Sequence, residues 1–183
     1  MAVLTPDEVG AITRGEALAP AGFAVVPLSR GMFALVDDCD LLMVSAHKWS
    51  ANRGGSTFYA VTNLSRGATP RSLLMHRLLL SAPPDFQVDH ANLNGLDNRR
   101  SANIRLATRT QNRANQEKFR GLSPYKGVSP YAHGFRAFIC AAGRKMHIGV
   151  FQDEISAAKA YDVAALQEFG EFARLNFPMP GTS

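Results

Sequence analysis

The chain has 183 residues, a formal net charge of +5 at pH 7 and two cysteines. That length allows one or two small domains, each with a modest core. Cys39 and Cys140 lie far apart with no CxxC pair, which argues against a zinc knuckle or a disulfide framework and fits a reducing compartment. No apolar run approaches transmembrane length, and no secretion signal opens the chain, so we expect a soluble cytosolic protein.

The positive charge is concentrated in the middle of the chain. Residues 1–70 carry five basic and six acidic groups, residues 71–120 carry nine and four, and residues 121–183 carry six and five. A local excess of this kind is typical of a surface that approaches phosphates. A solubilising charge imbalance would produce the same count, so the charge alone does not decide the function.

The first predicted elements are a short helix and a group of strands. Residues 5–8 read Thr-Pro-Asp-Glu, the pattern of a capping box with proline at the first helical position, and Gly15 predicts the helix end. A linker is expected at 19–22. Trp49 is expected to be a core aromatic. Apolar runs between turn residues predict strands at 24–28, 32–36, 58–63 and 72–80.

The second half of the chain contains two further groups of predicted elements. Residues 86–95 are expected to form a strand and a loop, and residues 98–115 a tight segment that runs into a helix. A Gly/Ser/Pro hinge follows at 120–124. Asp153 is a suitable N-cap for a last helix and Gly170 a suitable stop. Between hinge and helix, strands are predicted at 126–129, 135–141 and 145–151.

The sequence Val88-Asp89-His90, followed by Asn103 and Asn112, indicates a hydrolytic site. A histidine with a near-neutral pKa can deprotonate water. A carboxylate and amide oxygens suit Mg²⁺ or Mn²⁺ rather than zinc. An isolated Asp-His pair is commonplace, but here Asn-x-Arg and Thr-Arg-x-Gln-Asn blocks follow it in order. Together these residues are sufficient to build a one-metal nuclease site.

These blocks resemble the HNH homing-endonuclease family of phages and mobile introns, in the variant whose third motif residue is asparagine. The resemblance implies a ββα-metal module, in which a two-stranded hairpin and a helix hold one metal ion. It also implies products with a 5′-phosphate and a 3′-hydroxyl, and a phage or mobile-element gene expressed in the cytoplasm of a bacterial host. The matching residues are 75–77, 89–100, 103–105 and 108–112.

The same resemblance assigns roles to individual residues. His90 would be the general base, and Asn103 would hydrogen-bond and orient its ring. Asp89 and Asn112 would bind one Mg²⁺ or Mn²⁺, and no zinc, at the scissile phosphate. His76 matches a family position as well, but a core or near-site histidine is favoured over a metal ligand. The expected phosphate contacts are Arg99, Arg100, Arg105, Arg109 and Arg113.

Residues 123–178 resemble a second family, the apetala-two/ethylene-response-factor DNA-binding domain of plants, which also occurs fused to phage HNH nucleases. The resemblance implies a three-stranded sheet that is backed by a helix and enters the major groove. The departures from the plant pattern at Ser129, Cys140 and His147 put the plant target sequence in doubt. The matching segments are 125–128, 135–139, 147–151, 157–165 and 175–178.

The charges of this segment independently indicate that the sheet faces DNA. Residues 121–149 contain four basic and no acidic residues, whereas residues 150–183 contain two and five. Strand alternation directs positions 135, 137, 139, 146, 148 and 150 toward the helix. The helix positions expected to meet them are 155, 158, 161, 165 and 169. The expected DNA contacts are Lys126, Arg136, Arg144, Lys145 and His147.

The predicted fold class is α+β. It comprises a helix and linker (1–22), a β layer with the ββα-metal module (23–119), and a three-stranded antiparallel sheet packed on one helix (120–183). The predicted function is a metal-dependent, site-directed endonuclease that acts on double-stranded DNA as a monomer. A catalytically inactive DNA-binding regulator and an RNA-binding protein are the alternatives. The N-terminal layer is expected either to add DNA contacts through Lys48, Arg53 and Arg66 or to have a purely structural role.

Overall fold

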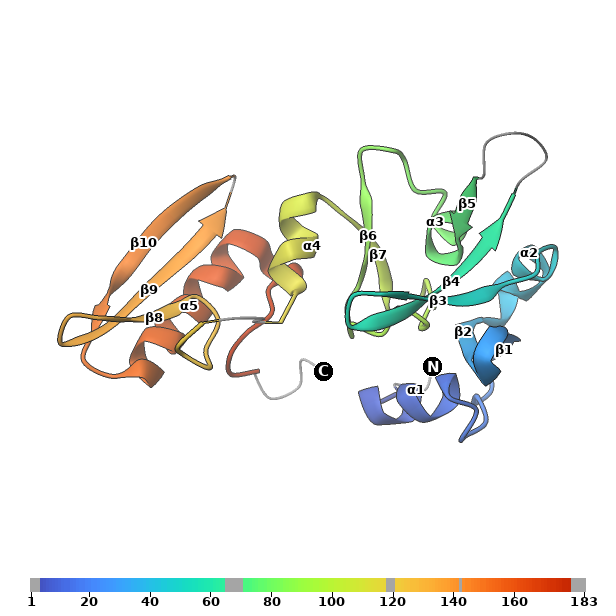
Figure 1. Cartoon of the computed structure of the whole chain (residues 1–183), viewed down its shortest axis with the longest axis horizontal. Coiled ribbons are helices and arrows are strands. Elements are labelled where there is room, and N and C mark those ends of the chain that lie inside the picture. Colours follow the sequence, from blue (N-terminus) through green and yellow to red (C-terminus); the bar gives the residue numbers. More distant parts are fainter. Residues whose placement is uncertain (1–3, 65–70, 118–120, 142, 179–183) are drawn as a thin grey trace. The chain divides into compact units, whose positions relative to one another are not determined.

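The computed structural model describes residues 4–64, 71–117, 121–141 and 143–178. The chain divides into two compact units, Met1–Ala107 and Thr108–Ser183, which we describe separately (Figure 1). The described residues form several small antiparallel sheets and few helices. We expected a boundary between residues 119 and 120, but the helix at 109–115 already belongs to the second unit. Arg66 and residues 118–120 lie outside the described residues.

The first unit opens with helix α1 (Pro6–Thr13), as its capping box predicts. The Thr5 hydroxyl accepts a hydrogen bond from the Glu8 backbone N–H at 3.3 Å, and the Glu8 carboxylate accepts one from the Thr5 N–H at 2.7 Å. An antiparallel pair follows, β1 (Phe23–Pro27) and β2 (Phe33–Asp37), with the short turn η1 (Ser29–Gly31) between them. The helix packs on this pair through Val9, Ile12, Phe23 and Leu35.

A three-stranded antiparallel sheet in the order β3-β4-β5 forms the next layer. Its strands are β3 (Ser50–Gly54), β4 (Thr57–Asn63) and β5 (Ser72–Leu74). The turn η2 (Asp38–Asp40) and helix α2 (Leu41–Ser45) connect β2 to β3. The predicted strands at 24–28, 32–36 and 58–63 are confirmed to within one residue at each end. Strand β3 was not predicted, because its Asn-Arg-Gly residues are typical of turns.

The prediction of one strand over residues 72–80 is wrong beyond Leu74. Strand β5 ends there, and helix α3 (Met75–Leu79) begins. The helix buries Met75, His76 and Leu79. A short apolar run suits a strand and a buried helix equally well, so its periodicity does not distinguish between them.

The first unit ends with the antiparallel pair β6 (Gln87–His90) and β7 (Ile104–Ala107), joined by the loop 91–103. Trp49 is only 6% exposed, and its indole N–H donates to the Val44 carbonyl at 2.8 Å, which confirms it as a core aromatic. Strands from three sheets therefore share one core. Its buried members are Val26, Ala34, Val36, Val44, Trp49, Ala60, Met75, Leu79, Val88 and Ile104.

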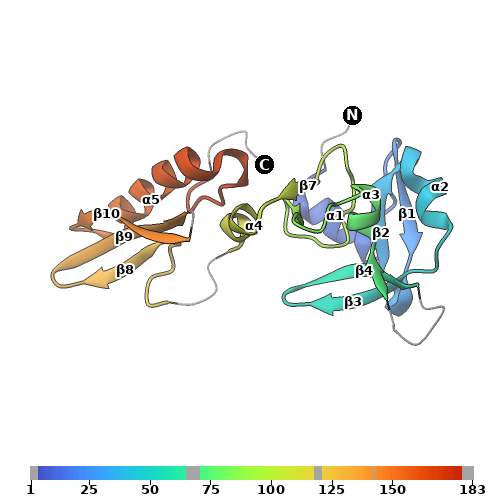
Figure 2. The same cartoon turned by 90° about the horizontal axis from the view of Figure 1, so that it is seen from above.

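The second unit begins with α4 (Arg109–Asn115), which has a capping box at Thr108. Helix α5 (Glu154–Phe169) begins after Asp153 and ends at Gly170, where the turn η3 (Gly170–Phe172) starts, so the predicted last helix is confirmed. Figure 2 shows α5 along one face of a sheet in the order β10-β9-β8. The strands of this sheet are β8 (Val128–Tyr131), β9 (Gly134–Ala141) and β10 (Arg144–Phe151).

Small residues allow α5 to approach the sheet closely. Ala157 and Ala158 are fully buried, and Ala165 is 1% exposed. Gly127 has a φ of +75°, and a Cβ at this position would lie 2.0 Å from the Tyr161 ring. The Tyr161 ring therefore occupies the space that any side chain at position 127 would need.

Three apolar residues that we expected between helix and sheet are exposed instead. The pairing of β9 and β10 shifts register between His147 and Gly149, which marks a β-bulge. A bulge adds one residue to a strand and so exchanges the faces of the side chains beyond it. Val150 consequently pairs with Arg136. The exposed residues are Met146 (38%), Val150 (52%) and Ile155 (49%).

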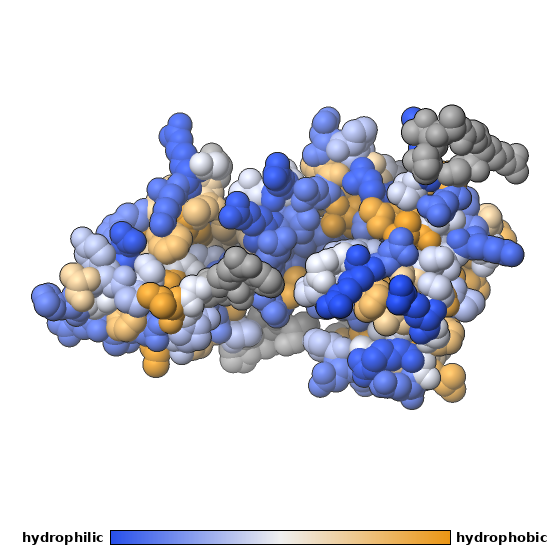
Figure 3. All heavy atoms as spheres, viewed as in Figure 1, coloured by the Kyte–Doolittle hydropathy of each residue, from blue (hydrophilic) through white to orange (hydrophobic). Residues whose placement is uncertain are grey.

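Among the described residues, no helix has both the length and the apolar composition needed to cross a bilayer. Figure 3 shows a face on which hydrophilic residues predominate and apolar residues form small groups. The most exposed large apolar side chains, Leu18 (94%) and Leu122 (91%), lie in different units.

Candidate functional site

Asp89 and His90 lie at the end of β6 and point into the interior of the first unit. Pairing with β7 places Asp89 opposite Arg105 and His90 opposite Ile104. The Asp89 side chain is 3% exposed, and its Oδ2 lies 2.9 Å from Arg105 Nε and 2.8 Å from Nη2. A buried carboxylate requires such a partner, because burial removes the water that would otherwise solvate its charge. Arg105, expected at a phosphate, thus pairs with Asp89.

The His90 ring belongs to a cluster of three rings. Its centroid lies 5.0 Å from that of His76 and 5.7 Å from that of Tyr59, and the His76 and Tyr59 centroids are 5.6 Å apart. The rings come from β6, α3 and β4, which are separate in the sequence. His76 is therefore a near-site histidine, as the sequence favours. Tyr59 was not predicted, because an aromatic residue in a strand is ordinary.

Both histidines of the cluster are neutral at pH 7. Burial lowers the pKa of His90 to about 4, although the neighbouring Asn98 side chain acts in the opposite direction. Burial lowers the pKa of His76 to about 3, and electrostatic interactions with His90 and Arg77 act in the same direction. A neutral imidazole has one nitrogen lone pair free of a proton, so the His90 ring is in the protonation state that a general base requires.

The loop 91–103 is held by its own polar side chains. Asn103 Oδ1 accepts from the Asn92 backbone N–H at 2.9 Å, and Asn103 Nδ2 donates to the Asp97 carbonyl at 2.7 Å. The Asn103 amide thus connects the end of the loop to its beginning and its middle. We expected Asn103 to hydrogen-bond the His90 ring, but both polar atoms of its amide bond within the loop instead.

Arg99 and Asp97 form a second brace within this loop. Arg99 Nε and Nη2 donate to the two Asp97 carboxylate oxygens at 2.8 and 2.7 Å. The side chains are 4% and 0% exposed. The Asn98 backbone N–H donates to the Leu35 carbonyl at 2.7 Å, which ties the loop to β2. The polar residues of this loop therefore build an ordered segment directly after His90.

Of the five arginines expected at phosphates, three pair with carboxylates in the first unit and two are exposed on α4. Arg99 and Arg105 are bound to carboxylates inside the first unit, as described above. Arg100 Nε donates to Asp40 at 2.7 Å, although its side chain is 41% exposed. We therefore assign Arg99 to the support of the loop, since its buried guanidinium has no surface to offer a phosphate. Arg109 and Arg113 are exposed on α4.

Asn112, the expected second metal ligand, lies half-buried on α4 of the second unit. Lys126 Nζ donates to the carbonyls of Ala114 and Gln116, the latter at 2.7 Å, at the end of this helix. Burial lowers the pKa of Lys126 to about 8, which leaves the ammonium protonated at pH 7. Lys126 was expected to contact DNA, but its charge satisfies the last carbonyls of α4.

The sheet face that α5 leaves open carries basic and aromatic side chains. Arg136 Cζ lies 5.1 Å from the centroid of the Tyr131 ring, and Lys145 Nζ lies 3.7 Å from that of Phe138. Ser129 pairs with Arg136 across β8 and β9. Within the described part of the chain, Ser129 Oγ and Arg136 Nε have no hydrogen-bond partner. The predicted DNA contacts on or beside this face are Arg136, Arg144, Lys145 and His147.

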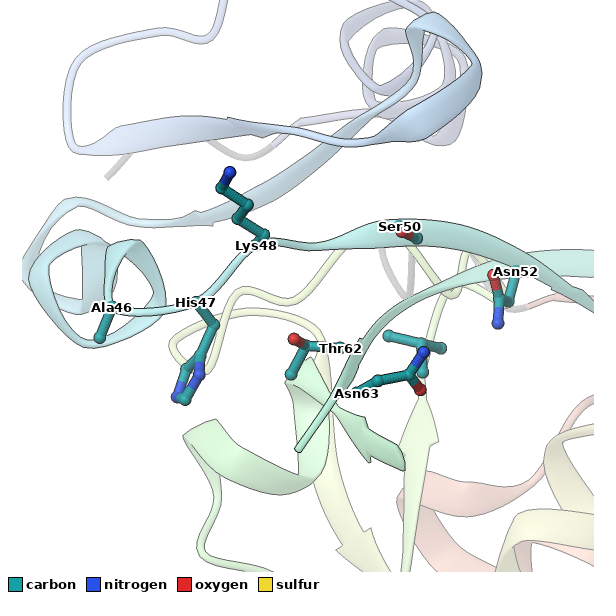
Figure 4. Close-up of a pocket in the computed structure, with 8 residues that line it drawn as sticks. Ala46, His47, Lys48, Ser50, Asn52, Thr62 and Asn63 are labelled. Atoms are coloured by element: carbon teal, nitrogen blue, oxygen red, sulfur yellow. The ribbon is translucent and has the colours of Figure 1, made fainter. Parts of the chain in front are cut away.

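A separate polar pocket lies in the first unit between the end of α2 and strands β3 and β4. Its volume is about 440 Å³. Figure 4 shows Lys48 pointing away from His47 and Thr62. The described residues that line it do not include those of the ring cluster, so the two features are distinct. They are Ala46, His47, Lys48, Ser50, Asn52, Val61, Thr62 and Asn63.

The chain resembles a curated viral protein over most of its length. It is 31% identical over 157 residues to an uncharacterised HNH endonuclease of Acanthamoeba polyphaga mimivirus, a match that covers 84% of this chain and 80% of the viral protein. The chain belongs to the HNH endonuclease family. No model of a protein family matches this HNH protein.

Two plant proteins match this HNH protein over shorter segments. It is 47% identical over 57 residues to an AP2/ERF and B3 domain-containing protein of Oryza sativa subsp. japonica, covering 31% of the chain and 16% of the plant protein. It is 36% identical over 70 residues to an AP2-like ethylene-responsive transcription factor of Arabidopsis thaliana, covering 32% and 23%. The chain therefore spans less than a quarter of either plant protein. These matches support the composite of two families that the sequence predicts.

Proposed function

We propose that this HNH-family protein is a metal-dependent DNA endonuclease whose second unit binds the DNA that it cuts. The observation that carries the proposal is the burial of Asp89 and His90 side by side at the end of β6, against a loop braced by Asn103. Family membership supports the nuclease reading, and the two plant matches support a DNA-binding domain.

His90 is the general base of the proposed reaction. Its neutral ring takes a proton from a water molecule whose oxygen forms a bond to the phosphorus. The bond between phosphorus and the 3′-oxygen breaks, which leaves a 5′-phosphate and, after protonation of the leaving oxygen, a 3′-hydroxyl. The rings of His76 and Tyr59 pack against the His90 ring and restrict its orientation.

Asp89 is the proposed ligand of one Mg²⁺ or Mn²⁺ ion in the first unit, and Asn112 stays a second ligand predicted from the sequence alone. A carboxylate and an amide oxygen are hard donors, and the pairing of Asp89 with Arg105 shows that this position accepts a positive charge. Among the described residues, no three His, Cys, Asp or Glu side chains gather into a metal cluster, so amide and water oxygens have to complete the coordination. A bound ion would neutralise charge at the phosphate and at the leaving oxygen.

The open sheet face of the second unit is the proposed DNA-binding surface. Arg136 and Lys145 lie on it, with their charged groups against the rings of Tyr131 and Phe138. Planar guanidinium groups bind guanine edges or phosphates in pairs of hydrogen bonds. Arg109 and Arg113 on α4 are further candidates for phosphate contacts.

Cleavage of supercoiled and linear DNA with randomised sequence tests the proposal. Wild type, His90→Ala and the control His133→Ala, which alters an exposed histidine of the second unit, are compared with Mg²⁺, Mn²⁺ or EDTA. We expect cutting by wild type and the control only with a metal, and no cutting by His90→Ala with DNA binding retained. If wild type binds duplex DNA but never cuts with either metal, a DNA-binding regulator replaces the nuclease. Preferential binding of single-stranded RNA would favour the RNA-binding alternative.

A further inference from the structure

We propose that Tyr59 is a further catalytic residue of this site, whose hydroxyl donates a hydrogen bond to a non-bridging oxygen of the scissile phosphate beside His90. The inference rests on the proposed nuclease function. It adds a residue from β4, a strand outside the hairpin that carries Asp89 and His90.

The Tyr59 ring is held in place on both edges by glycines. A Cβ on Gly95 would lie 2.6 Å from Tyr59 Cε1, and a Cβ on Gly54 would lie 2.8 Å from Cδ2 and Cε2. The Gly95 backbone N–H also donates to Thr57 Oγ1 at 3.0 Å, which joins the loop 91–103 to β4. The loop therefore packs directly against the tyrosine ring, and a side chain at position 95 would displace it.

The environment of the hydroxyl agrees with a role toward a phosphate. Tyr59 is half-buried, with its ring against both histidines of the cluster. A phenol hydroxyl keeps its proton at neutral pH, so Tyr59 has a hydrogen-bond donor to offer. No hydrogen-bond partner of this hydroxyl lies in the part of the chain that the structure describes. A protonated, unused donor near Asp89 and His90 is available to a substrate.

The proposed hydrogen bond requires no transfer of the tyrosine proton. During attack by water, negative charge increases on the non-bridging oxygens of the phosphate, and a fixed O–H donor stabilises that charge. His90 still accepts the proton of the water. The donor stabilises the transition state more than it stabilises the complex with uncut DNA. Its loss should therefore lower the rate of cleavage more than it lowers the affinity for DNA.

Tyr59→Phe tests the inference, because it removes one oxygen and keeps the ring between Gly54 and Gly95. Its matched control is Tyr125→Phe, which alters a half-buried tyrosine packed on Phe177 in the second unit. Cleavage is measured in single turnover with excess protein and Mn²⁺ or Mg²⁺, and DNA affinity is measured with EDTA. Fluorescence of the sole tryptophan, Trp49, reports the folding of the first unit.

We expect Tyr59→Phe to cut about 10- to 100-fold more slowly than wild type, with DNA affinity and folding unchanged, and Tyr125→Phe to cut normally. If wild type cuts DNA and Tyr59→Phe cuts it at the same rate, the role of Tyr59 is overturned, while the proposed nuclease function stands. A loss confined to DNA affinity, or a slower rate matched by a loss of folded protein, would overturn it as well. Failure of wild type itself to cut would instead remove the proposed function.

Discussion

Arg99 donates two hydrogen bonds to the carboxylate of Asp97, and both side chains are almost completely buried. The pair lies within the loop that follows His90 directly in the sequence. The Asp97 carbonyl additionally accepts from Asn103. The loop that directly follows the proposed base is therefore held by a buried ion pair.

The first prediction concerns this pair. Asp97→Asn removes the negative charge and leaves the Arg99 guanidinium buried without a counter-charge. We expect the unfolding free energy of the first unit to fall by about 3 kcal/mol, and cleavage to be lost as the loop moves. Urea titration followed by Trp49 fluorescence measures the change.

The exposed pair of Arg14 and Glu16 provides the control for this prediction. Its side chains are 56% and 57% exposed, so Glu16→Gln should leave the urea midpoint unchanged. The double variant Asp97→Leu with Arg99→Met should recover much of the stability lost in Asp97→Asn, because it leaves no charge buried. Equal effects of Asp97→Asn and Glu16→Gln would contradict the role of the buried pair.

The second prediction concerns acid stability. The pKa of His76 is about 3 in the folded protein and about 6.5 in an unfolded chain, so on acidification below pH 6.5 the unfolded chain takes up a proton that the folded chain does not. The stability that His76 contributes is thus fully present above pH 6.5 and decreases as pH falls. Between pH 6.5 and 5 we expect a loss of about 2 kcal/mol from this group.

His76→Gln removes this titration, so the variant should lose less stability than wild type between pH 6.5 and 5. The exposed His133, changed to Gln, is the control and should behave as wild type. Thermal unfolding at both pH values, followed by Trp49 fluorescence, gives the comparison. Parallel pH dependence of wild type and His76→Gln would exclude His76 as a source of acid sensitivity.

The third prediction concerns two glycines with nearly the same backbone conformation. Gly127 and Gly143 have φ values of +75° and +74°, but a Cβ at 127 would lie 2.0 Å from the Tyr161 ring, whereas a Cβ at 143 meets no atom within 4 Å. Gly143→Ala should cost about 1 kcal/mol from backbone strain alone. Gly127→Ala should separate α5 from the sheet and abolish DNA binding, while the Trp49 transition of the first unit stays unchanged. Circular dichroism and DNA titration measure both outcomes.

The fourth prediction compares two positive charges of the second unit. Arg136 lies on the open sheet face, whereas Lys159 is exposed on α5, the helix that covers the other face. Arg136→Ala should weaken specific DNA binding about 10- to 100-fold, corresponding to about 1–3 kcal/mol for a base contact. Lys159→Ala removes the same charge and should change affinity less than about twofold. A larger effect of Lys159→Ala would place the DNA on the helix side.

Elements with strong local signals were predictable from the sequence. The capping box at Thr5 and the Asp153 and Gly170 signals marked helices that the structure confirms. The hydrogen bonds behind these signals form between residues three or four positions apart, so the local sequence specifies them. Helix α3 was not predictable in this way, because its five residues, Met-His-Arg-Leu-Leu, are too few to show a unique periodicity and its tertiary contacts decide its conformation.

By itself, the sequence determined which chemical groups occur and in what order: the adjacent Asp89 and His90, the later asparagines, and the basic strands of the second half. The tertiary structure decided which partners these groups meet. It placed His76 and Tyr59 against His90, and it directed the Asn103 amide to Asn92 and Asp97 rather than to the His90 ring. Such contacts join segments whose proximity depends on the packing of the whole core, which no local pattern encodes.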